Sequence, residues 1–160
     1  MPSLDLFRRL FEYDYWANRQ ACASLTTPPS GNGASERAVK LFGHILGAHR
    51  IWLARLEQQD LSKLQPIPSL TLEQCREGME ELNGRWTAHL AKWTAEELPQ
   101  DILYRNSKGN EFRTPLQDIL MHMIMHSVYH RGQVAVAVRE AGGKPAATDY
   151  AVWVRQPKTS

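Results

Sequence analysis

The sequence predicts an all-α protein, a four-helix bundle with one small hairpin between the third and fourth helices. Four long stretches repeat apolar residues at three- and four-residue steps, as amphipathic helices do. Proline, glycine and serine gather between those stretches, and residues 101–113 alone combine short apolar runs with a turn signal. A chain of 160 residues is long enough to bury one core, so we expect a single domain over residues 1–160.

The first two helices follow from periodicity and from the residues that flank them. The first runs from Leu4 to about Leu25, and the segment 26–31, with its two prolines, ends it. Its apolar positions are Leu6, Leu10, Tyr13, Ala17 and Ala21. The second begins after Ser35, a suitable N-cap, and runs to about Gln58. Its apolar positions are Leu41, Ile45, Ala48, Trp52 and Leu56.

The second half of the chain holds two more helices and the hairpin. Thr71 and Gln74 have the capping-box spacing for a third helix, which runs to about Trp93. Residues 101–113 predict two short strands with Gly109 in the turn. So small a hairpin is marginally stable alone, so we expect it to pack against the helices. Thr114 as N-cap and Pro115 as the first helical residue start the fourth helix, which ends near residue 141. Residues 144–160 have no regular pattern.

Composition excludes several classes of protein. Nineteen basic against 17 acidic residues leave a net charge of +2, which gives no reason to expect nucleic acid or an anionic membrane as partner. Charged residues interrupt the first twenty positions, which excludes a secretory signal, and no apolar run approaches the ~20 residues that span a bilayer. Cys22 and Cys75 fall in separate helices and fit buried thiols in a reducing compartment, so we expect a cytoplasmic protein.

The fourth helix carries the most informative motif. His122, His126 and His130 stand four residues apart, so their imidazoles form one stripe on the helix. Neutral imidazole is the commonest protein ligand for metal ions, and apolar neighbours make an uncompensated ring costly to bury. A single histidine on such a face is usually a hydrogen-bonded core or boundary residue, but three in series favour a metal ion as the compensating group.

A metal site needs a further ligand from another helix, and the second helix offers His44 and His49. These two lie roughly 140° apart around the helix, so they do not serve one ion together. Periodicity alone does not choose between them. The stripe lacks the glutamate of a zinc-peptidase helix, and neither a Ser-His-Asp order nor a cysteine nucleophile stands out.

Several segments, in order along almost the whole chain, resemble the DinB/YfiT-like family. Residues 129–133 carry its His-Arg-Gly-Gln hallmark, and residues 15–19 resemble its first-helix motif. The other matching segments are residues 44–46, 52–56, 104–107, 112–116, 120–133, 138–145 and 148–150. The family name refers to damage-inducible expression and not to the translesion polymerase that shares it, and nothing in the sequence indicates a polymerase.

The resemblance implies an up-up-down-down bundle, commonly a homodimer, with a divalent metal ion held by His44, His126 and His130. His49 and His122 then lie outside the metal's ligands. Zinc or nickel is expected first, and iron or copper also suit imidazole. The resemblance further implies a metal-dependent enzyme for a small-molecule substrate, a transferase or isomerase that uses a low-molecular-weight thiol.

Three neutral ligands leave an open position on the ion, where the pKa of a bound water or thiol falls toward neutrality. Water activation would make the enzyme a hydrolase. One alternative is a non-catalytic metal-binding module of the stress response, and another is a structural dimer with an incidental histidine cluster.

Four further residues are candidates for the surroundings of the site. Gln133, one turn beyond His130, either orients a ligand or is an ordinary polar boundary residue. Asn18 and Trp52 are expected to line the cavity, although Trp52 suits the core equally well. Arg131 could hold a substrate carboxylate, but a solvated arginine or a dimer contact is the expected role.

Overall fold

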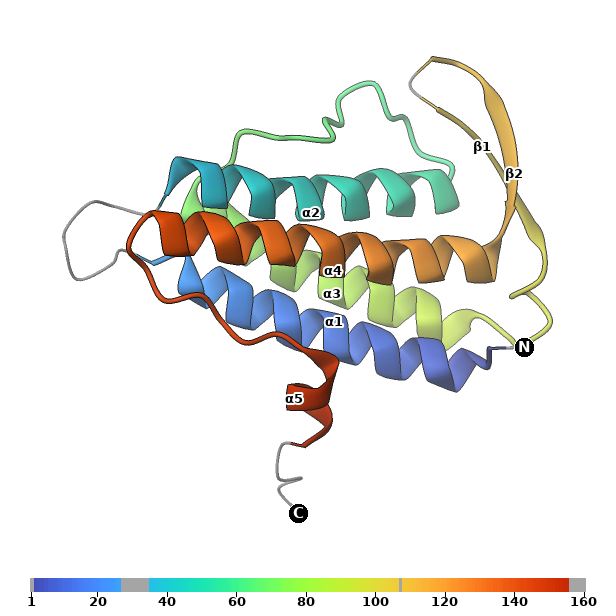
Figure 1. Ribbon diagram of the computed structural model, residues 1–160. Helices are drawn as coiled ribbons and strands as arrows, with labels where there is room; N and C mark the ends of the chain where they lie inside the picture. The colour runs from blue at the N-terminus through green and yellow to red at the C-terminus, as the bar shows by residue number, and fades with distance from the viewer. Residues whose placement is uncertain (1, 27–34, 107, 156–160) are drawn as a thin grey trace.

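The computed structural model describes residues 2–26, 35–106 and 108–155, and it confirms the all-α class with a small hairpin. Figure 1 shows the long helices packed side by side, with the hairpin at one end. The elements are α1 (Leu4–Ser24), α2 (Glu36–Leu56), α3 (Leu72–Lys92), β1 (Asp101–Arg105), β2 (Glu111–Pro115), α4 (Leu116–Glu140) and α5 (Tyr150–Val154). Most of segment 26–31, predicted to end the first helix, lies outside the described residues.

Side-chain caps start three of the four long helices. The Ser3 hydroxyl accepts the backbone N–H of Leu6, and Ser35 caps α2 in the same way. Thr71 and Gln74 form the predicted capping box, in which each side chain accepts a backbone N–H of the other residue. These bonds satisfy donors that have no partner inside the helix.

The start of α4 differs from the prediction. Thr114 and Pro115 belong to β2, and Pro115 is the residue before the first helical residue, Leu116. No side chain caps this helix; instead Leu116 N–H donates to the carbonyl of Gln100 at 3.0 Å, and the next N–H donates to the carbonyl of Leu98. The carbonyls of the segment before β1 therefore accept hydrogen bonds from the first N–H groups of α4. The sequence had predicted that the Thr114 side chain would cap these groups.

The chain beyond α4 also differs, because Tyr150–Val154 forms the short helix α5. Two of its aromatic rings pack on Tyr13 of α1, with centroid distances of 5.1 Å for Tyr150 and 5.9 Å for Trp153. A helix of five residues is too short to leave a periodic signal in the sequence, and these long-range contacts hold it in place.

The helix directions are up, down, down, up, so the up-up-down-down order implied by the resemblance is wrong. Arg37 at the start of α2 pairs with Glu140 at the end of α4, which makes these helices antiparallel. Contacts of α1 with α3 run from Arg8–Leu90 to Tyr15–Glu80, again antiparallel. The connection 57–71 runs back along α2 and makes α2 and α3 parallel (Figure 1).

We call this connection, residues 57–71, the strap. It packs closely on α2 at Gly47, where a Cβ atom would lie 2.7 Å from the carbonyl oxygen of Pro66 and 2.8 Å from that of Gln65. Only glycine allows the backbone of the strap to approach this closely. The strap therefore lies directly over the face of α2 that carries His44.

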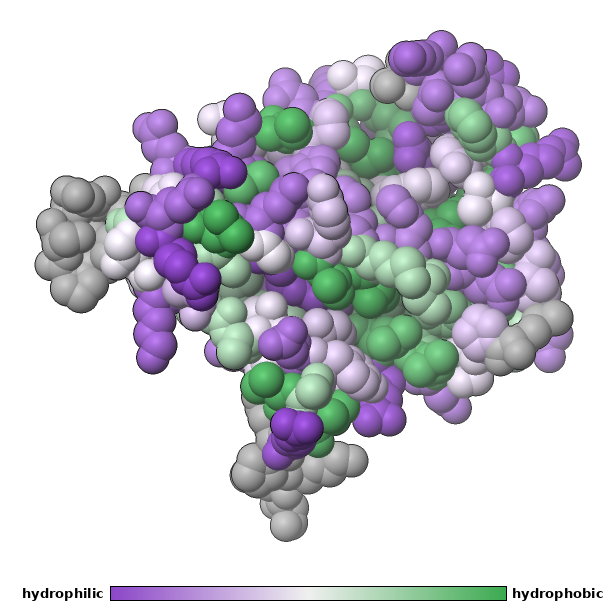
Figure 2. Space-filling view, viewed as in Figure 1, coloured by the Kyte–Doolittle hydropathy of each residue, from purple (hydrophilic) through white to green (hydrophobic). Residues whose placement is uncertain are grey.

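The core fills the space between the four helices, and α4 leaves one apolar stripe outside it. Phe7, Phe42, Leu53 and Met123 are fully buried, one from each of α1 and α4 and two from α2. Exposed apolar side chains of α4 are Met125, Val128, Tyr129 and Val136. Figure 2 shows hydrophobic side chains among hydrophilic ones on the face of the molecule that carries α4 in Figure 1. None of the described helices has the length and apolar character required to cross a membrane.

Candidate metal site

Three histidines from two helices meet at the interface of α2 and α4. His44 comes from α2, while His126 and His130 lie one turn apart on α4, and one nitrogen from each ring lies within 4.8 Å of the others. The ring of His130 has its centroid 4.3 Å from the centroids of both other rings. A tetrahedral Zn²⁺ bound at about 2.0–2.1 Å to each imidazole separates the nitrogens by about 3.4 Å, so modest ring rotations complete a site.

Two of these rings have one nitrogen held by a carbonyl oxygen. Nδ1 of His44 lies 2.6 Å from the backbone oxygen of Pro66 in the strap, and Nδ1 of His130 lies 2.8 Å from Oε1 of Gln133. A carbonyl oxygen only accepts, so each Nδ1 carries the hydrogen and each Nε2 keeps its lone pair. Hydrogen bonds of this kind orient metal-binding imidazoles in proteins.

His126 is the ring with the strongest tendency to stay neutral. Burial, followed by the neighbouring His130 and His44, lowers the pKa of His126 to about 3. Burial also lowers the pKa of His130, against the hydrogen bond that His130 donates to Gln133, which raises it. Nδ1 of His126 is buried without a hydrogen-bond partner in the described part of the chain. Neutral rings and an unpaired buried nitrogen are what a bound cation requires of its ligands.

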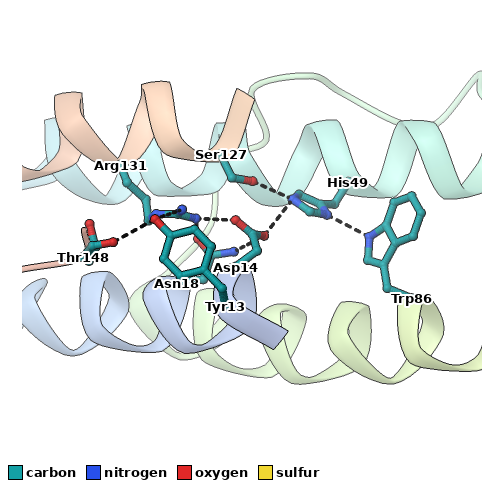
Figure 3. A network of polar contacts seen from close by, with 8 residues as sticks. All are labelled: Tyr13, Asp14, Asn18, His49, Trp86, Ser127, Arg131 and Thr148. Carbon is teal, nitrogen blue, oxygen red and sulfur yellow. Dashed lines mark hydrogen bonds and ion pairs between the residues drawn. The ribbon is translucent and has the colours of Figure 1, made fainter. Parts of the chain in front are cut away.

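The structure places the other two candidate histidines outside this cluster. His122 is one turn before His126 on α4, with ring centroids 5.6 Å apart, and it is exposed. His49 is buried on the inner side of α2, where the Trp86 indole N–H donates to its Nδ1 at 2.8 Å (Figure 3). Its Nε2–H therefore donates to the hydroxyl of Ser127, 2.9 Å away.

Arg131 lies in the core, so the expectation of a solvated arginine or a dimer contact is wrong. The residue is 2% exposed, and its side chain pairs with Asp14 of α1 and donates to Oδ1 of Asn18 at 2.9 Å. Figure 3 shows these groups and Tyr13 around the guanidinium. Sequence reasoning missed this pair because Asp14 lies 117 residues from Arg131. The one signal of a buried ion pair was the position of Asp14 on the apolar face of the first helix, four residues before Asn18.

Asn18 and Trp52, both expected to line the metal cavity, lie in different places. Asn18 is buried in the ion-pair network and borders a small cavity next to His49 and Trp86, away from the three histidines. Trp52 is partly buried, and its ring centroid lies 5.7 Å from that of His122. Trp52 therefore lies on the side of α2 and α4 that carries the histidine cluster.

Covalent catalysis by the protein finds no support in this geometry. Ser127 and Asp14 both lie near Nε2 of His49, whereas a Ser-His-Asp triad needs them on opposite nitrogens. Cys22 and Cys75 are free and buried, and burial raises the pKa of each thiol to about 11. These groups are protonated at neutral pH and are poor nucleophiles.

Comparison with known proteins gives consistent matches over nearly the whole chain. Residues 8–158 match the family model described as DinB family. Protein DinB of Bacillus subtilis (strain 168) is 26% identical over 167 residues, covering 97% of this chain and 97% of that protein. A DinB-like protein of Bacillus cereus ATCC 10987 has a similar fold, with a TM-score of 0.64 and 20% identity over 89% of this chain and 95% of the other. The chain therefore belongs to the DinB family.

Proposed function

We propose that His44, His126 and His130 bind one divalent metal ion and that the protein is a metal-dependent enzyme. The observation that carries the proposal is the convergence of three imidazoles with one nitrogen each within 4.8 Å. Two of them are oriented through Nδ1, and burial keeps the third neutral. Imidazole ligands suit zinc and nickel first, and iron or copper as well.

A divalent ion held by three neutral histidines is a Lewis acid with an open position, at which the pKa of a thiol or water falls toward neutrality. We propose a transferase or isomerase that acts on a small molecule with a low-molecular-weight thiol. Such thiols are abundant in reducing compartments, and the free cysteines Cys22 and Cys75 suit the cytoplasm. Within the chain, Pro66 and Gln133 hold two of the rings in position.

Metal binding is the first test. The wild-type protein is expected to bind one equivalent of Zn²⁺ in isothermal titration calorimetry. The variants His44→Ala and His126→Ala each remove a ligand and should weaken binding roughly 100-fold or more. The exposed His122 lies outside the three, so His122→Ala is the matched control and should keep the wild-type affinity. Equal affinity in all four proteins would show that the cluster is not the site.

Turnover is the second test. The metal-loaded protein is assayed for consumption of small thiols in the presence of a panel of electrophiles, and the His126→Ala protein should lose the activity. Activity that is the same in the two proteins would remove the metal-thiol mechanism.

A second function, a non-catalytic metal-binding module of the stress response, has one observation in its favour. Four cavities among the described residues, one of them next to His49 and Trp86, are lined by side chains other than His44, His126 and His130. Tight metal binding without turnover of any thiol and electrophile pair would support this module over the enzyme.

A further inference from the structure

Arg55, in the last turn of α2, packs against two aromatic rings. Its guanidinium carbon is 4.5 Å from the ring centroid of Trp52 and 4.9 Å from that of Tyr104 on β1. The two rings contact each other with centroids 4.8 Å apart. All three side chains are partly exposed, so the guanidinium is held in place while solvent still reaches this surface. We call these three residues the Arg55 shelf.

The charge of Arg55 has no carboxylate partner within residues 2–26, 35–106 and 108–155, and its Nε is buried without a hydrogen-bond acceptor. Other partly or fully buried arginines of the bundle are paired. Arg131 contacts Asp14, and Arg85 lies 2.6 Å from Glu57. A partly buried charge is costly without compensation, and the rings and the C-terminal end of α2 supply only part of it. An anion would supply the compensation that the rings and the helix end leave incomplete.

The Arg55 shelf adjoins the candidate metal site through His122. The His122 ring centroid lies 5.7 Å from that of Trp52 on one side and 5.6 Å from that of His126 on the other. The positive charge of Arg55 contributes, after burial, to the lowered pKa of His122. A small molecule that reaches the three histidines can therefore extend along His122 to Arg55.

We propose that the Arg55 shelf is a subsite for the carboxylate of a substrate whose reactive group lies at His44, His126 and His130. A guanidinium presents parallel N–H donors that match the two oxygens of a carboxylate, and the rings fix its plane. The subsite assigns the substrate class as a carboxylate-bearing thiol, or a carboxylate-bearing molecule that reacts with one. Its position beside the metal rests on the proposed function, whereas anion binding by Arg55 does not.

The first experiment needs no metal. Succinate is titrated into the metal-free protein at constant ionic strength, and the Arg55 Nε–H signal is followed by ¹⁵N–¹H NMR, with Arg55→Gln to assign it. A saturable shift of that signal is expected, with no shift for the exposed Arg113 on β2. A signal of Arg55 that does not move, or that moves only as Arg113 does, overturns the subsite.

The second experiment uses the Co²⁺-loaded protein, whose visible absorption reports thiol binding. Straight-chain mercaptocarboxylates of increasing length are compared with mercaptoalcohols of the same length. If the thiol carries the carboxylate, one length should bind about tenfold tighter than its alcohol, and Arg55→Gln should abolish the difference. If a second substrate carries it, mercaptoethanol and succinate should bind together, and only the succinate affinity should depend on Arg55.

The two proposals fail in different ways. Loss of Co²⁺ binding by the wild-type protein overturns the metal site, while the succinate titration still decides the subsite. Normal Co²⁺ binding with no dependence of either ligand on Arg55 overturns the subsite alone. Arg55→Lys keeps the charge at the end of α2 but lacks the planar donors, so it should fold and give an intermediate affinity for succinate.

Discussion

Neighbouring residues of the His-Arg-Gly-Gln hallmark have two different roles, one at the histidine cluster and one in the core. His130 and Gln133 face the histidine cluster, whereas Arg131 points into the core and meets Asp14 and Asn18 of α1. The first-helix motif, which contains Asn18, therefore supplies part of the pocket for the arginine of the last-helix motif. The two motifs fit together because residues adjacent on a helix point about 100° apart.

Removing one partner of the buried pair should be costly. Arg131→Met leaves the Asp14 carboxylate buried without its cation, and we expect the free energy of unfolding to fall by about 3–5 kcal/mol. Urea denaturation measures this change. The matched control is Arg37→Met, which breaks the exposed pair with Glu140 and should cost at most about 1 kcal/mol. Similar losses in the two variants would contradict the structural role assigned to Arg131.

The strap is the element that orients His44, and Gly47 is the position at which it can be displaced. In Gly47→Ala the added methyl group would lie 2.7 Å from the Pro66 oxygen, so the strap must move away from α2. That oxygen accepts the hydrogen bond from Nδ1 of His44, so Zn²⁺ affinity should fall about 10-fold or more, measured by titration calorimetry.

Gly84→Ala is the control for the strap experiment. This helical glycine has open space around it, so alanine should stabilise the protein by about 0.5–1 kcal/mol and leave Zn²⁺ binding unchanged. Wild-type affinity in Gly47→Ala would mean that the Pro66 carbonyl does not position His44.

Local patterns predicted the elements well, because periodicity and capping residues act within a few positions of the chain. Features that depend on long-range contacts escaped the prediction. The helix order follows from the path of the strap, and the start of α4 from the carbonyls of Leu98 and Gln100. At the candidate site, spacing found the stripe of His122, His126 and His130. The family resemblance chose His126 and His130 within that stripe, and it chose His44 over His49. Arg55 was missed because its aromatic neighbour Tyr104 lies on a distant strand.

Acid should destabilise the whole molecule. Burial lowers the pKa of His49; the charge of Asp14 opposes this shift and the charge of Arg131 adds to it. Burial and the neighbouring histidines lower the pKa of His126 to about 3. These folded-state values lie below the ordinary value of about 6.5, so the unfolded chain binds more protons. The stability of the metal-free protein should be complete above about pH 6.5 and fall as the pH drops toward 3, by at most about 1.4 kcal/mol per pH unit for each histidine.

Urea denaturation at a series of pH values checks this expectation, with His49→Gln as the variant that removes one of the titrating groups. Its dependence on pH should be shallower than that of the wild type by about one proton. A free energy of unfolding that is constant between pH 7 and 4 would contradict the burial of neutral histidines.

We propose that the molecule pairs with a second copy through the exposed apolar stripe of α4. Met125 and Tyr129 lie one turn apart and are 62% and 66% exposed, and Val128 and Val136 extend the stripe along the helix. A two-fold axis across one helix brings the same residues of both copies together, which suits a continuous apolar stripe. The Tyr129 ring also contacts His130, so the partner would lie beside the candidate metal site.

Sedimentation velocity is the measurement for this pairing, and the wild-type protein should sediment as a dimer. Val128→Lys places a charge in the middle of the stripe and should yield monomers, because each two-fold interface would then bury two unpaired ammonium groups. The control Thr87→Lys adds the same charge at an exposed position of α3 and should leave the dimer intact. A wild-type monomer would remove the proposed dimer. A Val128→Lys protein that remains dimeric would place the contact on another surface, because Val128 lies in the middle of the proposed interface.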